Sequence, residues 1–247
     1  MDPTAFTLFG IDIQWYGILI ATGAFLAIVL GIKQTKTTVG ITEDDFIDSV
    51  LWILPIAVVC ARLYYVVFFD FAYYMANPMQ ILNFREGGLA IYGGVIGGII
   101  VGWIFCKRRK INFFTLFDIA APGLALAQGI GRWGNFINQE AHGGPTDLPW
   151  GIMVNGIKVH PTFLYESIVD IGLFFFLYFY LRKHKKYEGQ MAATYMVVYS
   201  LARFFIEGLR TDSLMLGSFR VSQLVSIGGI IIGLIVGYMN RKNLVKK

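Results

Sequence analysis

Residues 15–32 read WYGILIATGAFLAIVLGI, an apolar run without a charged residue. About 20 such residues in a helix match the thickness of a bilayer's hydrocarbon core. Because lipid cannot satisfy free backbone N–H and C=O groups, helix is the form that we expect for such a run. Similar runs follow at residues 47–69, 89–106, 113–130, 162–181, 191–209 and 221–239. The sequence therefore predicts an all-α integral membrane protein with seven transmembrane helices.

The composition agrees with this class. Of 247 residues, 56% are hydrophobic and 15% are charged, and the mean hydropathy is +0.60. Soluble proteins carry about 25% charged residues. The apolar runs fill most of the chain, which predicts a single membrane-embedded domain over residues 1–247. Residues 1–14 contain no Lys or Arg, so they lack the basic start of a signal peptide, and we expect the first run to stay uncleaved.

Lysines and arginines are divided unequally between alternate loops. The richer set has 14 members and the poorer set five, with two more inside the runs. Because cytoplasmic loops are the richer ones in Lys and Arg, the C-terminus is expected in the cytoplasm and the N-terminus outside. The richer set comprises Lys33, Lys36, Lys107, Arg108, Arg109, Lys110, Arg182, Lys183, Lys185, Lys186, Arg241, Lys242, Lys246 and Lys247, and the poorer set Arg85, Arg132, Lys158, Arg210 and Arg220.

This distribution also bears on the partners. The net charge of +5 follows the loops as an orientation signal, so no nucleic-acid partner is expected. Residues 132–161 form the longest connection, which falls outside, and loops of such length are often functional. Cys60 and Cys106 lie inside apolar runs and are expected to be packing residues. No His, Cys and carboxylate cluster has metal-ligand spacing, so no metal site is expected.

A polar stripe follows the run at 191–209. Tyr199, Arg203, Glu207 and Arg210 fall within a sector of about 80° at the helical angle of about 100° per residue. One interpretation is a structural Arg203–Glu207 ion pair at i, i+4. The other is an anion site, which two arginines and a tyrosine favour.

Polar residues of other runs are predicted at the same depth. With the orientation above, Tyr16, Tyr92, Arg132 and Glu166 all lie near outer helix ends. Arg203 lies about 10 Å below such an end at 1.5 Å per residue. Lipid phosphates occupy that level.

The densest polar segment is GRWGNFINQEAHGG at residues 131–144. The guanidinium of Arg132 can hold two phosphate oxygens, and the glycines let backbone approach a ligand. Asn135 and Asn138 can bond glycerol hydroxyls, or they can belong to a well-capped turn at a helix end. His142 and His160 are interpreted as structural residues of the external loop. Inside the runs, Arg62 and Asp118 are expected to form interhelical pairs, and Asp170 to pair within the bundle.

Five segments together resemble the family of prolipoprotein diacylglyceryl transferases. GRWGNFINQE at 131–140 is similar to the signature of that family. The other four segments stand in the family's order: WYG at 15–17, GGLAIYGGVIGG at 87–98, HPTFLYES at 160–167 and ARFFIEGLRTD at 202–212. The resemblance covers essentially the whole chain.

The resemblance implies a defined reaction. Such enzymes transfer the diacylglyceryl group of phosphatidylglycerol to the thiol of the lipobox cysteine of a preprolipoprotein and release glycerol phosphate. This is the first step of bacterial lipoprotein maturation, and it uses no cofactor. The implied partners are phosphatidylglycerol, the signal peptides of preprolipoproteins and membrane lipids. The implied location is the bacterial cytoplasmic (inner) membrane, with the active site facing the outer leaflet.

The family's functional residues map onto matching positions of this sequence. The expected catalytic residues are Arg132, Arg203, Glu140, Tyr16 and Tyr92, and the expected substrate-binding residues, beside Arg132, are Asn135, Asn138, Gly143, Tyr199, Glu207, Arg210, His160, Gly93 and Gly94. Many members carry histidine where this chain has Tyr92. Because a tyrosine has a pKa of about 10, we assign Tyr92 hydrogen bonding or orientation. Glu140 is the candidate either to accept a proton or to orient an arginine.

Two other classes fit a polytopic chain. A multi-pass small-solute transporter should show repeat symmetry and broken spans near the midplane, and neither is visible here. A non-catalytic lipoprotein-binding membrane protein would not need two arginines and a carboxylate at phosphate depth.

Overall fold

The computed structural model describes residues 2–83 and 87–241. The basic residues Arg85, Lys242, Lys246 and Lys247 of the orientation argument lie outside the described residues. The chain divides into two compact units of helices. Unit 1 comprises Met1–Gln34 and Phe117–Lys247, and unit 2 comprises Thr35–Leu116.

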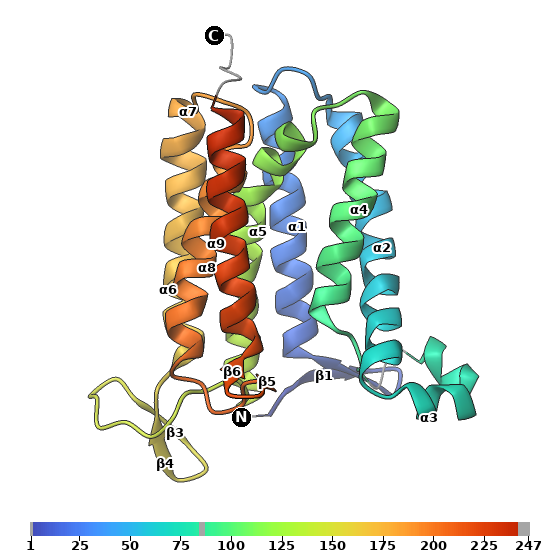
Figure 1. Ribbon diagram of the computed structural model, residues 1–247. Helices are drawn as coiled ribbons and strands as arrows, with labels where there is room; N and C mark the ends of the chain where they lie inside the picture. Colours follow the sequence, from blue (N-terminus) through green and yellow to red (C-terminus); the bar gives the residue numbers. More distant parts are fainter. Residues whose placement is uncertain (1, 84–86, 242–247) are drawn as a thin grey trace. The chain divides into compact units, whose positions relative to one another are not determined.

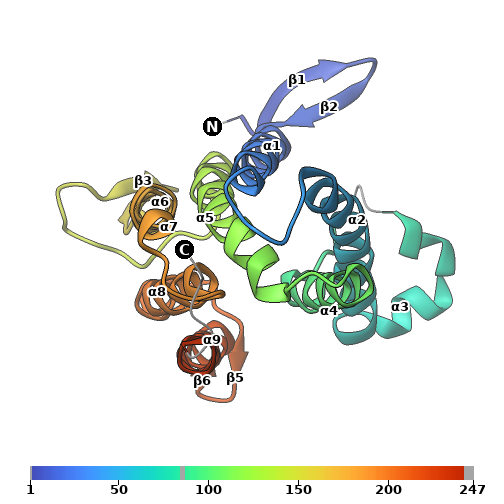
Figure 2. The ribbon, with the colours of Figure 1, turned by 90° about the horizontal axis from the view of Figure 1, so that it is seen from above.

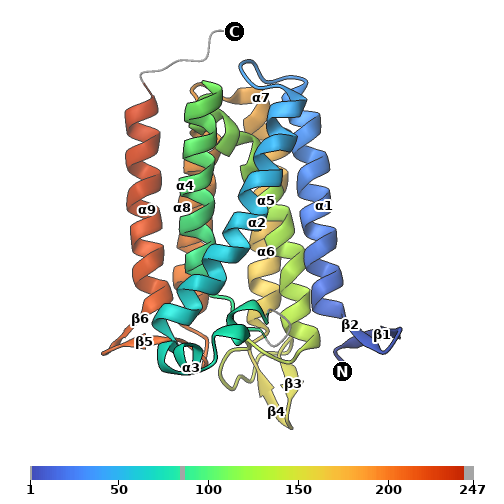
Figure 3. The same ribbon diagram turned by 90° about the vertical axis from the view of Figure 1, so that its right-hand side faces the viewer.

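Unit 1 consists of long helices with three short antiparallel hairpins at one end, opposite the end of α9 (Figures 1 and 3). The hairpins are β1 (Thr4–Leu8) with β2 (Ile11–Gln14), β3 (Ile152–Val154) with β4 (Ile157–Val159), and β5 (Met215–Leu216) with β6 (Phe219–Arg220). The helices are α1 (Trp15–Thr35), α5 (Phe113–Ile137), α6 (Thr162–Phe175), the π-helical segment η2 (Phe176–Leu181), α7 (Arg182–His184), α8 (Gln190–Glu207) and α9 (Val221–Asn240).

Small residues bring α1 and α5 together. A Cβ at Gly23 would lie 3.0 Å from the Cα of Ala127, and one at Gly123 would lie 2.9 Å from that of Ala27. Such close backbone approach is typical of packing between helices in lipid. The buried amide of Gln34 donates to the Ile119 carbonyl at 2.8 Å. α5 is therefore fixed against α1 along its length.

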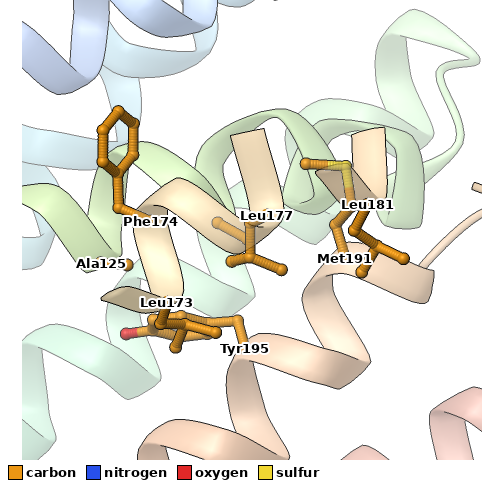
Figure 4. Close-up of a cluster of buried hydrophobic side chains, with 8 residues drawn as sticks. Ala125, Leu173, Phe174, Leu177, Leu181, Met191 and Tyr195 are labelled. Atoms are coloured by element: carbon orange, nitrogen blue, oxygen red, sulfur yellow. The ribbon is translucent and has the colours of Figure 1, made fainter. Parts of the chain in front are cut away.

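The apolar core of unit 1 lies between α5, α6–η2 and α8 (Figure 4). α8 packs against both α6 and α9 and lies between them (Figure 2). The Asp118 carboxylate on α5 accepts the N–H groups of Gly189 and Ala192 and pairs with Lys185 at 3.1 Å. Asp118 is thus paired as expected, although its ion-pair partner stands in the connection between α7 and α8 and not within a helix, and its carboxylate caps the start of α8. The core residues are Ala121, Ala125, Leu173, Phe174, Leu177, Leu181, Met191 and Tyr195.

Unit 2 contains α2 (Glu43–Phe68), α3 (Phe71–Ala76), the short 3-10 helix η1 (Pro78–Leu82) and α4 (Ile91–Arg109). Thr42 and Asp45 form a capping box that starts α2. Arg62 is 3% exposed, and its guanidinium donates to five carbonyl groups of η1 and of the segment between η1 and α4. These are the carbonyls of Gln80, Ile81, Asn83, Gly87 and Gly88. Arg62 therefore shapes this connection.

Among the described residues, six helices are long and apolar enough to cross a membrane: α1, α2, α4, α5, Thr162–His184 and α9. The expected all-α membrane class is thus supported, whereas the count of seven stays a prediction. The predicted run at 191–209 is the 18-residue helix α8, whose Gln190, Arg203 and Glu207 make it more polar than the others. α5 extends to Ile137, past the predicted limit at 130. Arg132 therefore lies on a helix and not in the external loop.

Candidate active site

Charged side chains of unit 1 form one alternating series across three helices. Glu166 on α6 lies between two arginines, 2.6 Å from Arg132 Nη2 on α5 and 2.5 Å from Arg203 Nη1 on α8. Arg203 Nη2 is 2.6 Å from Glu207, and Glu207 is 3.9 Å from Arg210 Nε. Glu166 thus joins residues that lie far apart in the sequence.

The series ends at the surface after α8. Arg210 bonds both carboxylate oxygens of Asp212, at 2.9 and 2.8 Å. Burial alone would raise the pKa of Asp212, but the hydrogen bonds and charge of Arg210 outweigh it and lower that pKa below its usual value. The Arg210–Asp212 pair is therefore charged near neutral pH.

The carboxylates are buried more deeply than the arginines. Glu166 is 4% exposed and Glu207 is 1% exposed, whereas the side chains of Arg132 and Arg203 are 20% and 15% exposed. Buried charges are tolerated when they are paired. The structural Arg203–Glu207 pair exists, and Arg203 also bonds Glu166. The two interpretations of the polar stripe are therefore compatible.

Arg132 keeps bonding capacity. Its Nε is buried and has no hydrogen-bond partner among the described residues. Since the arginines of the series are already matched by carboxylates, an incoming anion would be held by N–H donors that remain and not by excess net charge.

Two predicted tyrosines lie near Arg132. A Cβ at Gly134 would collide with the Tyr16 ring, so glycine at 134 lets Tyr16 of α1 lie against α5 close to Arg132. Tyr199 stacks on Tyr195 with ring centroids 5.7 Å apart, and the hydroxyl groups of Tyr16 and Tyr199 both lie within range of the Arg132 charge. The structure thus brings Tyr16, Arg132, Tyr199, Arg203, Glu207 and Arg210 together.

The asparagines and Glu140 form a separate cluster at the end of α5. Glu140 accepts hydrogen bonds from the side chains of Asn135 at 2.9 Å and Asn138 at 3.4 Å. Gln139 and Ala141 on either side have φ values of 55° and 56°, which are unusual for residues other than glycine. This turn directs Glu140 back toward the helix end. Among residues 2–83 and 87–241, no arginine pairs with Glu140.

A cavity of about 280 Å³ opens beside this turn. It lies at the level of the β3–β4 hairpin, and no arginine of the charged series lines it. The lining residues are Asn135, Phe136, Gln139, Glu140, His142, Ile152, Met153, Val154 and Phe163.

Gly143 and His160 take part in backbone contacts that join the segment after α5 to the segments before α6 and after α8. Gly143 donates to the His160 carbonyl, and the next residue, Gly144, donates to that of Leu209, both at 2.9 Å. A Cβ at Gly143 would lie 2.6 Å from the His160 Cβ. The absence of a side chain at Gly143 therefore lets the chain pass between two segments. One is the start of α6, and the other is the segment after α8, which carries Arg210. The His160 ring lies 3.4 Å from the Tyr165 hydroxyl.

Three predicted residues belong to unit 2. Tyr92 is half-buried in the first turn of α4. A Cβ at Gly93 would meet the Cys60 carbonyl oxygen at 2.5 Å, whereas one at Gly94 would make ordinary contacts of 3.5 Å or more. Gly93 thus has a packing role against α2.

Glu166 was predicted to lie at the depth of the site but not to be one of its residues. The feature that could have indicated a site role is its position one turn into the apolar run at 162–181, within the segment HPTFLYES. Asp170, one turn further along α6, is 2% exposed, and its Oδ2 has no hydrogen-bond partner among the described residues. Next to Glu166, Ser167 accepts from Trp133 Nε1 at 3.2 Å and donates to the Gly129 carbonyl at 2.8 Å. These bonds fasten α6 to α5 beside Arg132.

In the described part of the chain, no group of three or more His, Cys, Asp or Glu side chains could hold a metal ion.

Apolar helices with a buried arginine–carboxylate series at one end define a multi-pass membrane protein with a candidate anion site. Residues 3–239 match the family model described as prolipoprotein diacylglyceryl transferase.

Similar proteins are named phosphatidylglycerol–prolipoprotein diacylglyceryl transferase. That of Clostridioides difficile is 58% identical over 98% of this chain and 97% of its own length. Those of Finegoldia magna and Clostridium novyi are 50% and 49% identical, over 100% and 96% of this chain and 98% and 95% of their own lengths. The chain belongs to the prolipoprotein diacylglyceryl transferase family and is a transferase, which confirms the resemblance.

Proposed function

We propose that this chain transfers the diacylglyceryl group of phosphatidylglycerol to the thiol of a lipobox cysteine in a preprolipoprotein. The observation that carries the proposal is Arg132, which Glu166 holds in a buried site while its Nε keeps a donor for a ligand. Membership of the family supports phosphatidylglycerol as the anion that this site binds. It also replaces the transporter interpretation.

The reaction makes a C–S bond and breaks a C–O bond. The sulfur attacks the primary glyceryl carbon, and the electron pair of the C–O bond leaves with the phosphate as glycerol phosphate. The thiol proton is released. A singly charged phosphodiester thus becomes a doubly charged monoester. Stabilising that additional negative charge is the main electrostatic demand on the site.

Arg132 and Arg203 are proposed to meet this demand. Because Glu166 holds both guanidinium groups, they are oriented before the substrate arrives. A positive environment also favours the thiolate of the incoming cysteine, whose ordinary pKa is about 8.5. Glu207 and Arg210 are proposed to hold Arg203 in place in the same way.

The remaining predicted residues are assigned roles around these arginines. Tyr16 and Tyr199 are proposed to donate to the phosphate or its glycerol group. Gly93 and Gly94 are proposed as substrate-binding residues, and Tyr92 as an orienting hydrogen-bond donor.

The cluster at the end of α5 is proposed to receive the headgroup or the peptide. Glu140, whose carboxylate accepts from Asn135 and Asn138, is the candidate proton acceptor. Gly143 and His160 would act by fixing the loop that bounds the site.

We also propose the finer topology and location. α8 serves as a seventh span, the N-terminus lies outside, and the whole chain acts as one domain in the bacterial inner membrane. The proposed substrates are phosphatidylglycerol of the outer leaflet and the signal peptide of a preprolipoprotein.

The test is transfer by the purified full chain. It is incubated with phosphatidylglycerol and a lipobox peptide, and the peptide mass and the released glycerol phosphate are measured. We expect one diacylglyceryl group per peptide and one glycerol phosphate per transfer. A peptide with serine for the lipobox cysteine is the control. A folded chain that modifies neither peptide, or that modifies both equally, would contradict the proposal.

A further inference from the structure

A groove runs between α8 and α9 at the end of unit 1 where α9 ends. Its volume is about 510 Å³. Arg203 and Glu207 lie toward the other end of α8, so the groove is separate from the arginine–carboxylate series. Its lining residues are Lys186, Tyr187, Gln190, Ala193, Thr194, Val197, Val198, Gly233, Leu234, Gly237, Tyr238 and Arg241.

Small and apolar residues line the groove between the two helices, and polar residues join them toward the start of α8 and after α9. Gly233 packs tightly on α8, since a Cβ there would lie 2.8 Å from Val197 Cγ2. A Cβ at Gly237 would lie 3.4 Å from the Tyr187 hydroxyl oxygen and 3.7 Å from the Ala193 Cβ, so glycine at 237 keeps the groove open beside these two side chains. Leu234 and Tyr238 are 60% and 75% exposed and border it.

The length of this groove suits one leaflet. Arg241 is eight positions after Gly233, or about 12 Å along the helix at 1.5 Å per residue. Half of a hydrocarbon core of about 30 Å is comparable. The groove is therefore about as deep as one acyl-chain layer, with its apolar residues on the side away from Arg241.

Two cations stand at the mouth of the groove. Lys186 precedes α8 and Arg241 follows α9, and both are exposed. Neither forms an ion pair with a carboxylate of residues 2–83 or 87–241. The nearby Glu188 pairs with Lys185 at 3.0 Å. An apolar groove under two such cations is complementary to an anionic headgroup with an acyl chain.

We propose that this groove binds one anionic phospholipid of the adjacent leaflet. Its phosphate lies between Lys186 and Arg241, and one acyl chain follows Gly237 and Gly233. This lipid is a ligand of the α8–α9 pair and not the substrate of the transfer reaction.

The test measures lipid retained by the full chain in native mass spectrometry. The probes are phosphatidic acid and phosphatidylcholine with identical acyl chains. Phosphatidic acid has no glycerol headgroup to release. We expect Lys186→Gln with Arg241→Gln to weaken one phosphatidic acid site roughly 25-fold, at about fivefold per removed cation. Lys33→Gln with Lys36→Gln also removes two exposed charges and should leave that site unchanged, and diacylglyceryl transfer should persist in both variants.

A second variant tests the groove with its charges intact. Leu234→Trp places a large ring on the border of the groove, so the same phosphatidic acid site should be lost while the unfolding temperature in detergent is kept. Equal retention of phosphatidylcholine and phosphatidic acid would overturn the proposal. So would equal weakening in the Lys33 and Lys36 control, or unchanged binding in Leu234→Trp. A dimer that this tryptophan abolishes would assign the groove to a second copy of the chain.

Discussion

Glu166 contacts both arginines that we propose as phosphate ligands. Its carboxylate is 4% exposed and lies within 2.6 Å of each guanidinium. Without it, two positive charges would face each other in a buried site. The geometry of Arg132 and Arg203 therefore depends on this residue.

Glu166→Gln keeps the shape of the side chain and removes its charge. Breaking a buried ion pair costs about 3–5 kcal/mol, so the unfolding temperature and the transfer rate should both fall. Asp212→Asn is the matched control, because its side chain is 49% exposed and a surface pair contributes about 0–1 kcal/mol. Equal effects of the two substitutions on stability would show that Glu166 is not a structural centre.

Arg132→Lys tests the donor geometry at the same charge. Lysine lacks the planar pair of donors, so the exchange is not conservative at a bidentate site. Losing one charge-assisted bond costs about 1.5–3 kcal/mol, which is roughly tenfold to a hundredfold in rate. The measurement is transfer rate at saturating lipid, with membrane insertion as the control. Full activity would remove Arg132 from the proposed role.

Tyr92 tests the proton chemistry. If it only orients a group, Tyr92→Phe should cost one hydrogen bond, about 0.5–1.5 kcal/mol, and Tyr92→His should be tolerated. A general base would instead be worth about 100-fold to 10,000-fold in rate. The measurement is transfer rate against pH for the three forms. We expect the moderate loss with an unchanged profile, and a near-total loss with one limb missing would make Tyr92 the base.

For single residues, the sequence was a better guide to which side chains lie close together than to the hydrogen-bond or ion-pair partner of each one. The spacing of Arg203 and Glu207 on one helix face predicted their ion pair. The position of Glu166 between two arginines depends on how α5, α6 and α8 pack, which no local spacing encodes. Glu140 was expected to orient an arginine or accept a proton, and its bonds to two asparagines leave the first role to Glu166.

For the helices too, local sequence patterns predicted some features, whereas others depend on packing or on short polar segments. Apolar runs predicted the helix positions because lipid imposes length and composition. The ends differed where polar residues continue a helix, as α5 does through Arg132 to Ile137. The hairpins were missed because each strand has only two to five residues, too few for a clear alternation.

The packing of α2 on α4 can be tested with two adjacent glycines. A Cβ at Gly93 would lie 2.5 Å from the Cys60 carbonyl oxygen, while one at Gly94 would make contacts of 3.5 Å and longer. Gly93→Ala should therefore destabilise the chain by about 1–3 kcal/mol through overpacking. Gly94→Ala should be neutral or stabilising, since alanine favours helix by about 1 kcal/mol over glycine.

The readouts for these glycines are the unfolding temperature and the transfer rate. Comparable unfolding temperatures of Gly93→Ala and Gly94→Ala would contradict the packing argument. A loss of transfer in Gly94→Ala at unchanged stability would support its proposed place in the substrate site.

For the whole molecule, the division of basic residues predicts which end of the helices faces which side. The segment that carries Asp147 belongs to the poorer set of loops, and the segment with Lys183 to the richer one. Both side chains are exposed, so cysteines placed there can react without unfolding. The native thiols interfere little, since Cys106 is 1% exposed and Cys60 is half-buried.

The measurement is labelling of intact spheroplasts with a thiol reagent that cannot cross the membrane. Asp147→Cys should react from outside, and Lys183→Cys should react only after the membrane is opened, because cytoplasmic loops hold the excess of Lys and Arg. The unsubstituted chain gives the background. In unit 1 the hairpins lie at the end opposite the end of α9, so this result also assigns the arginine–carboxylate series to a leaflet. Reversed labelling would put that series at the cytoplasmic face, and phosphatidylglycerol of the outer leaflet could not then be the substrate.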